Sequence, residues 1–136
     1  RKESSAASDV YKRQDSDEEA IDSVLETITF STLGSTIVSA VVFELVNEDD
    51  STDIVTGTYN AGTKTVIFDT TGMAANNNTI DDGKTETYKV VITGTAVDVD
   101  QITLTLPKNG VVYTADVTSG IEVNLDNEID FGSRTY

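Results

Sequence analysis

The chain has 136 residues, enough for one domain, and carries 9 basic against 24 acidic residues, a formal net charge of −15. Nucleic-acid binding is not expected, because no cationic surface is available to neutralise phosphates. The chain has no Cys and no His, which removes the usual ligands of zinc sites and the usual nucleophile–base pairs of hydrolases. No stretch approaches the ~18 apolar residues of a membrane-spanning helix, so membrane insertion is not expected either.

The N-terminal segment has an unusual composition for the start of a domain. Eleven consecutive residues, Ser4 to Gln14 (SSAASDVYKRQ), resemble the translated read-through of a transposon-type sequencing adapter. We therefore interpret residues 1–14 as a non-native, adapter-derived segment of a fragment, the alternative being a genuine basic arm. The remaining residues 15–136 hold 5 basic and 22 acidic residues, a net charge of −17.

The first part of the remaining sequence leads from an acidic linker into strands. Residues 15–22 (DSDEEAID) are polar and predict a linker. Residues 24–30 (VLETITF) alternate, which places Ile28 and Phe30 on one face of a strand. Residues 37–46 (IVSAVVFELV) are apolar on both faces and predict a central, well-covered strand.

The middle of the chain predicts a hairpin followed by a crossing. Residues 54–59 and 63–69 are strand-like and are separated by Asn60-Ala61-Gly62, residue types that tolerate the backbone angles of a tight turn. Residues 70–83 form the longest irregular segment. We expect this segment to cross from one sheet to another.

The last part of the chain alternates clearly between apolar and polar residues. Residues 84–93 place Tyr88, Val90 and Ile92 on one face, and residues 101–106 do the same with Ile102, Leu104 and Leu106. The turn Pro107-Lys108-Asn109-Gly110 contains Asn-Gly, a hairpin signal, and predicts that residues 111–117 return beside 101–106. Residues 121–125 (IEVNL) predict a final strand.

Seven or eight short strands at intervals of ~8–12 residues, with turn residues between them, are typical of a β-sandwich. We therefore predict an all-β, antiparallel, immunoglobulin-like sandwich over residues 23–127. Residues 128–136 are expected to be a linker or a truncated end.

A resemblance to a known class of modules supports this fold. The segments TIDDGKTETYKVVI (79–92) and FELVNEDDSTDIVTGTYNAGTKTVIFD (43–69) resemble immunoglobulin-like modules repeated in large exported proteins of environmental bacteria. The resemblance implies a structural or adhesive module at the cell surface or outside the cell. Its partners would be neighbouring modules of the same protein or other surface proteins. It supplies no catalytic residues, since fold alone does not define function.

Calcium is the most specific ligand that the sequence predicts. Hard cations take oxygen ligands from carboxylates, Asn and backbone carbonyls, and loops at one end of a sandwich lie close together. The candidate ligands lie in an acidic loop and before a later strand: Asp49, Asp50, Asp53, Asp98 and Asp100. The spacing of an EF-hand loop is not met, and a plain solvated hairpin is the alternative.

The composition also bears on two other classes of function. An enzyme is not expected, because the usual triads are absent, although counting residues does not exclude a pair of catalytic carboxylates. A carbohydrate-binding module that takes glycans is the alternative to the structural module. Such modules use exposed aromatic side chains, but this chain has no Trp, and Tyr59, Tyr88 and Tyr113 are predicted to lie in the core or at strand edges.

Overall fold

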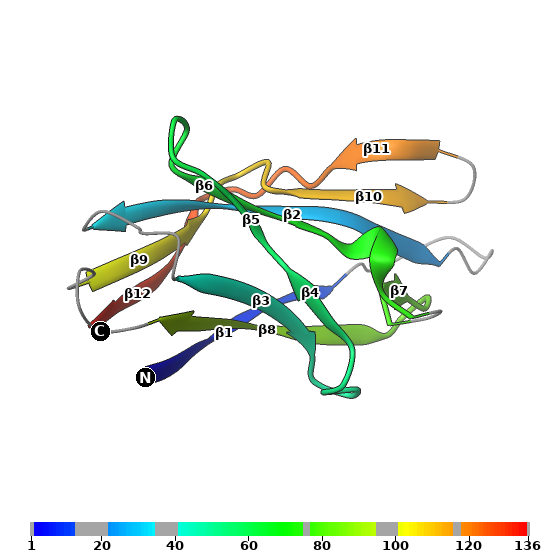
Figure 1. Ribbon diagram of the computed structural model, residues 1–136. Coiled ribbons are helices and arrows are strands. Elements are labelled where there is room, and N and C mark those ends of the chain that lie inside the picture. The colour runs from blue at the N-terminus through cyan, green and yellow to red at the C-terminus, as the bar shows by residue number, and fades with distance from the viewer. Residues whose placement is uncertain are drawn as a thin grey trace.

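The computed structural model describes residues 2–12, 22–34, 41–74, 77–94, 101–115 and 118–135. These residues form an antiparallel β-sandwich, which confirms the predicted all-β class (Figure 1). One short 3₁₀ turn, η1 (Thr70–Gly72), interrupts the strands. Two sheets face each other, and β9 and β12 slope from one layer toward the other.

The two sheets differ in size. Sheet A has four strands in the order β1 (Lys2–Lys12), β8 (Thr85–Gly94), β3 (Val42–Asn47) and β4 (Ile54–Thr56). Sheet B has eight strands, of which five follow the order β11 (Thr118–Glu122), β10 (Val111–Ala115), β2 (Ser23–Gly34), β6 (Thr65–Asp69) and β5 (Thr58–Asn60). The other three are β7 (Thr79–Ile80), β9 (Gln101–Leu106) and β12 (Ile129–Thr135).

Strand β2 organises sheet B. Its 12 residues pair with β6 and β7 along one edge and with β10 and β9 along the other. Strand β12 then extends the sheet beyond β9. The chain leaves sheet B after β7 and enters sheet A at β8, so the predicted crossing between sheets after residue 69 is confirmed.

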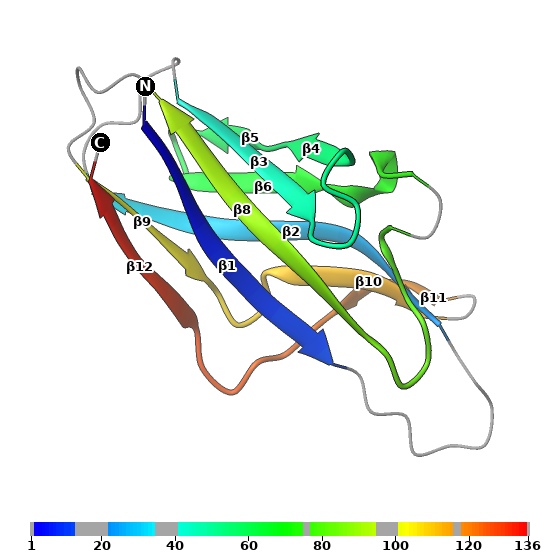
Figure 2. The same cartoon turned by 90° about the horizontal axis from the view of Figure 1, so that it is seen from below.

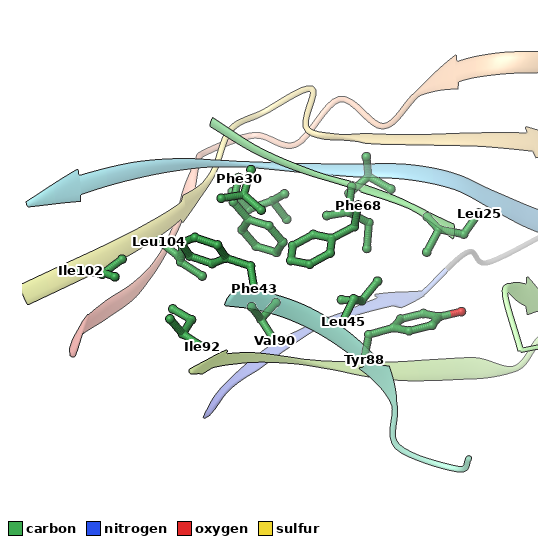
Figure 3. Close-up of a cluster of buried hydrophobic side chains, with 14 of the residues drawn as sticks. Leu25, Phe30, Phe43, Leu45, Phe68, Tyr88, Val90, Ile92, Ile102 and Leu104 are labelled. Carbon is green, nitrogen blue, oxygen red and sulfur yellow. The ribbon is translucent and has the colours of Figure 1, made fainter. Parts of the chain in front are cut away.

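The apolar core lies between the two sheets, as the alternation predicts. Tyr88, Val90 and Ile92 are 1–3% exposed and face inward from sheet A. Three aromatic residues occupy the centre of the core in Figure 3, Phe30 and Phe68 from sheet B and Phe43 from sheet A. The Phe30 and Phe68 rings meet edge to face with centroids 5.9 Å apart, a favoured aromatic geometry.

Gly57 marks the point where the chain changes sheets. The residues predicted as a single strand, 54–59, are divided there, since β4 pairs with β3 in sheet A and β5 with β6 in sheet B. The Gly57 N–H donates to the Phe43 carbonyl at 2.8 Å. A Cβ at this position would lie 2.7 Å from side-chain atoms of both Phe68 and Val66, so only glycine allows the backbone to pass this close to the core. The second half of the prediction, a hairpin through Asn60-Ala61-Gly62, is confirmed by the pairing of β5 with β6.

The hairpin predicted at Asn109-Gly110 is wrong. Strands β9 and β10 both run antiparallel to β2 and lie one after the other along the same edge, with Thr105 opposite Ser31 and Val111 opposite Ile28. The turn therefore leads the chain from one part of the β2 edge to the next without reversing its direction. The Gly110 carbonyl accepts the Thr29 N–H at 2.7 Å, and this contact ties the turn to β2.

The strands extend beyond the predicted domain of residues 23–127. Residues 2–12 form β1, which pairs with β8 (Figure 2), and Ile129–Thr135 forms β12 where a linker or truncated end was expected. The described residues thus contain 12 strands against the predicted seven or eight, partly because one strand is split at Gly57. The origin of residues 1–14 stays a prediction. The N-terminal part of the predicted strand 37–46 lies outside the described residues, and Val42–Asn47 forms β3.

Candidate functional site

The acidic loop between β3 and β4 is held by the side chain of Asn47, the last residue of β3. Asn47 is 1% exposed. Its Oδ1 accepts the N–H groups of Asp49 at 2.8 Å and Asp50 at 3.3 Å. Asn favours such turns because its side chain mimics a backbone carbonyl. The loop therefore has a defined shape although most of its side chains are charged.

Asn77 connects this loop to the segment before β7. Its carbonyl accepts Asn47 Nδ2 at 2.8 Å and the Tyr88 hydroxyl at 2.7 Å. Its own Nδ2 donates to Asp50 Oδ2 at 3.1 Å and to Asp53 Oδ2 at 2.8 Å. Two carboxylates thus converge on a single amide. We call Asn47, Asp50, Asp53, Asn77 and Tyr88 the Asn77 network.

Further hydrogen bonds fix the two carboxylates. Asp50 Oδ1 accepts the Thr52 hydroxyl at 2.7 Å and the Thr52 N–H at 3.2 Å. Asp53 Oδ2 also accepts the Ala74 N–H at 2.8 Å. The hydrogen bonds from the Thr52 hydroxyl, the Asn77 amide and the Thr52 N–H lower the pKa of Asp50, because they favour its charged form.

The pKa values of Glu86 and Tyr88 are shifted upward, in the opposite direction from that of Asp50. Burial raises the pKa of Glu86, and the charges of Asp49 and Asp81 raise it further against the opposing hydrogen bond from Asn47. Burial also raises the pKa of Tyr88 above its usual range, with smaller contributions from the charges of Glu86 and Asp53. Tyr88 therefore stays a neutral hydrogen-bond donor to Asn77. The site carries a strong negative charge, and it borders the apolar core.

The structure brings together only part of the predicted calcium set. Asp50 and Asp53 meet at Asn77, whereas Asp49 is exposed and joins the loop through its backbone N–H. Asp98 and Asp100 lie outside the described residues. Among the described residues, no three acidic side chains are grouped so as to hold a metal ion. Two of the five predicted ligands, Asp50 and Asp53, thus converge on one point.

Sequence reasoning missed the two asparagines that build the site. Asn47 follows an apolar strand and precedes an acidic run, which is a turn signal. Nothing local shows that its partner Asn77 lies 30 residues away. The hydrogen bond between Asn47 and Asn77 forms only because packing of the two sheets places the Asn77 carbonyl beside the Tyr88 hydroxyl.

The donor set defines what the site can do chemically. As placed, it is a closed hydrogen-bond network in which one amide satisfies two carboxylates. The amide of Asn77 also has a carbonyl oxygen, and rotation of the amide by half a turn would direct this oxygen at the same point. Two carboxylate oxygens and one amide oxygen are ligand types that calcium accepts. No nucleophile–base pair forms part of the network.

The three tyrosines whose side chains the structure describes, Tyr59, Tyr88 and Tyr113, do not form an exposed aromatic surface. Tyr88 is buried in the core, and Tyr59 stacks on Phe43 with ring centroids 6.1 Å apart and an interplanar angle of 27°. Tyr113 is half-buried on β10. No observation on these three residues favours glycan binding.

Comparisons with known proteins do not place the chain in a family. No family model, no curated protein and no solved structure matches it. Within the described residues, there is no helix with the length and apolar character needed to cross a bilayer.

Proposed function

We propose that residues 23–135 form a non-enzymatic, immunoglobulin-like structural module of an extracellular bacterial surface protein. The observation that carries this proposal is the path of the chain. Strand β2 begins at Ser23, and β12 ends at Thr135 beside Gln101 and Ile102, which lie at the Gly34 end of β2. The described strands from β2 to β12 therefore begin at one end of β2 and finish at the other, as Figures 1 and 2 show.

This path suits a protein built from modules in a row. A strand of 12 residues spans up to about 36 Å. Each module would then add a roughly constant length between its neighbours. The acidic surface, with a net charge of −17 for residues 15–136, keeps such a chain soluble and opposes collapse of neighbouring modules onto one another.

The interpretation of residues 1–14 as non-native bears on this proposal. Strand β1 begins beside Gly94 and ends beside Thr85, so it returns the N-terminal end of the chain to the end where β12 finishes (Figure 2). A chain with β1 in place has both ends on one side, a geometry suited to a side branch. Without β1, the described strands begin at Ser23 and finish at the opposite end of β2, a geometry suited to a spacer.

Solution scattering tests the spacer proposal directly. We would compare one, two and three fused copies of residues 15–136 by small-angle X-ray scattering. A spacer predicts that the maximum dimension grows by a constant step of up to about 36 Å per copy. Compact dimers and trimers without this step would contradict it. Binding to a polysaccharide panel would instead support a carbohydrate-binding module, and hydrolysis of any member would support an enzyme.

The Asn77 network gives this module a candidate cation site. We expect calcium to bind between Asp50 and Asp53 with the amide oxygen of Asn77 turned inward, which would rigidify the loop at one end of the module. The support is the convergence of both carboxylates on one point, at 3.1 and 2.8 Å from the same nitrogen.

A further inference from the structure

The two edges of sheet A are protected very differently. One edge is β4, which has three residues and ends where the chain leaves the sheet at Gly57. Without β1, the opposite edge of sheet A would be β8, which has ten residues, no Pro and a single Lys, Lys89. Natural edge strands are usually short, charged or interrupted, because an unprotected edge pairs with other strands. Strand β8 is neither short nor interrupted and has only two charged residues, Glu86 and Lys89, and β1 covers it.

The pairing of β1 with β8 is long. It runs antiparallel from Lys2 opposite Gly94 to Lys12 opposite Thr85, with one irregularity between Ala7 and Val10. The central part of β1 is SSAAS, residues 4–8, and Ser and Ala have little intrinsic preference for strands. A ladder of backbone hydrogen bonds accepts any extended segment without Pro, so the β8 edge places few demands on the sequence that it pairs with.

We propose that the outer edge of β8 is a strand-accepting interface, which this chain fills with its own residues 2–12 and which a second copy of the chain can fill with the same strand. This proposal does not depend on the proposed function. It concerns the chain with residues 1–14 present, and asks which copy of β1 occupies β8.

Charge favours the N-terminal strand as the part of a second copy that approaches. Residues 15–136 carry −17, so the bodies of two copies repel each other. Residues 1–14 carry four basic and two acidic residues, a net charge of +2, against −17 for the rest of the chain. Attraction between this segment of one copy and the acidic body of another therefore favours the encounter that exchange of β1 requires.

The connection between β1 and β2 is long enough for exchange. Lys12 lies opposite Thr85, and the Asp22 carboxylate accepts the Asp82 N–H at 3.1 Å, so both ends of the connection meet the same short stretch of chain. Nine residues, 13–21, join these points and can span about 30 Å when extended. A tether of this length holds β1 beside its own β8 at an effective concentration on the order of 1 mM, so exchange requires protein concentrations near that value.

Chemical crosslinking of the full chain tests the proposal. Because the chain has no Cys, the variant Ser5→Cys/Val91→Cys contains only two thiols, at positions directly opposite in the β1–β8 register. We would crosslink it with a short bismaleimide over a range of concentrations. We expect an intrachain product at about 10 μM and an interchain dimer that rises to a large fraction at about 1 mM.

Two further variants make the result decisive. The pair Ala7→Cys/Lys89→Cys is also in register and should behave in the same way if the first variant fails to fold. The control Ser5→Cys/Glu122→Cys places the second thiol on the exposed strand β11 of sheet B and reports random collisions. Crosslinking of the in-register pairs no higher than that of the control would overturn the proposal, and so would a product that stays intrachain at every concentration.

Discussion

The centre of the sandwich and the Asn77 network are held together by different forces. Phe30, Phe43 and Phe68 exclude water by packing, which is non-directional and roughly proportional to the apolar area that is buried. The Asn77 network depends on a few directional hydrogen bonds from Asn47 and Asn77, each of which replaces a bond to water. The centre should therefore set the stability of the domain, whereas the network should set the conformation of one loop.

The largest effect should come from the aromatic centre. The variant Phe43→Ala should lose about 3–5 kcal/mol of unfolding free energy, because it leaves a cavity beside Tyr59 and Phe68. Urea denaturation measures this loss. The control is Ile67→Ala, since Ile67 is 41% exposed on the outer face of sheet B, and it should cost under about 1 kcal/mol. Equal losses in the two variants would show that the centre is not what holds the sheets together.

The next largest effect should come from Asn47. The variant Asn47→Ala removes hydrogen bonds to two loop N–H groups and to the Asn77 carbonyl in a buried position, and should cost about 2–3 kcal/mol. The control Asn60→Ala removes the same kind of turn from the exposed β5–β6 hairpin, where Asn60 Oδ1 accepts the Gly62 and Thr63 N–H groups. It should cost about 0.5 kcal/mol, because water replaces the lost bonds. Similar losses in the two would indicate that the network adds nothing beyond its turn.

Calcium should strengthen the network without altering the centre. At ten times its dissociation constant, calcium would stabilise the folded state by about 1.4 kcal/mol, which raises Tm by about 3–6 °C. Thermal unfolding with calcium and with EDTA measures the shift. The shift should disappear in Asp53→Asn. A shift that magnesium or sodium chloride of equal ionic strength reproduces would leave the loop as a solvated hairpin.

The smallest effect should come from the charge of Glu86. Its pKa is raised in the folded state, so its ionisation costs stability as the pH rises from its ordinary value of 4.5 through the folded value. Asp50 has the opposite sign, because its lowered pKa contributes stability above 3.8 that is lost as the pH falls through the folded value. The variant Glu86→Gln should therefore raise Tm at pH 7 by under about 2 °C. This gain should vanish at pH 3, and a gain that persists there would show that the charge of Glu86 is not its cause.

Much of the fold could be predicted from local patterns, because alternation reports which face of a strand is buried. The alternation of Tyr88, Val90 and Ile92, and the Asn60-Ala61-Gly62 hairpin, were predicted correctly for this reason. The Asn109-Gly110 turn was misjudged because its outcome depends on β2, whose edge is long enough to accept two strands in sequence. The sequence around Gly57 did not indicate that the predicted strand 54–59 is divided there, since the role of this glycine depends on contact with Phe68 and Val66.

The predicted site was found only in part for a similar reason. Composition locates an acidic loop and therefore identifies Asp50 and Asp53. It does not identify the buried amides that orient them, because Asn47 and Asn77 become neighbours only when the two sheets pack. The sequence thus predicts which charges are available, while tertiary packing decides which of them converge.

The position of β2 has a consequence for how the chain reaches its native state. This strand is made before the strands that it pairs with, and its pairs Thr27–Asp69 and Ser23–Ala115 join residues that lie 42 and 92 positions apart. Pairing across such distances costs loop entropy before it brings any stabilisation, and domains with many non-local pairs fold in about milliseconds to seconds. The edges of β2 therefore cannot be fully paired until the last third of the domain has been made. Acquisition of structure should be a late and concerted event in which the two halves of the chain become ordered together.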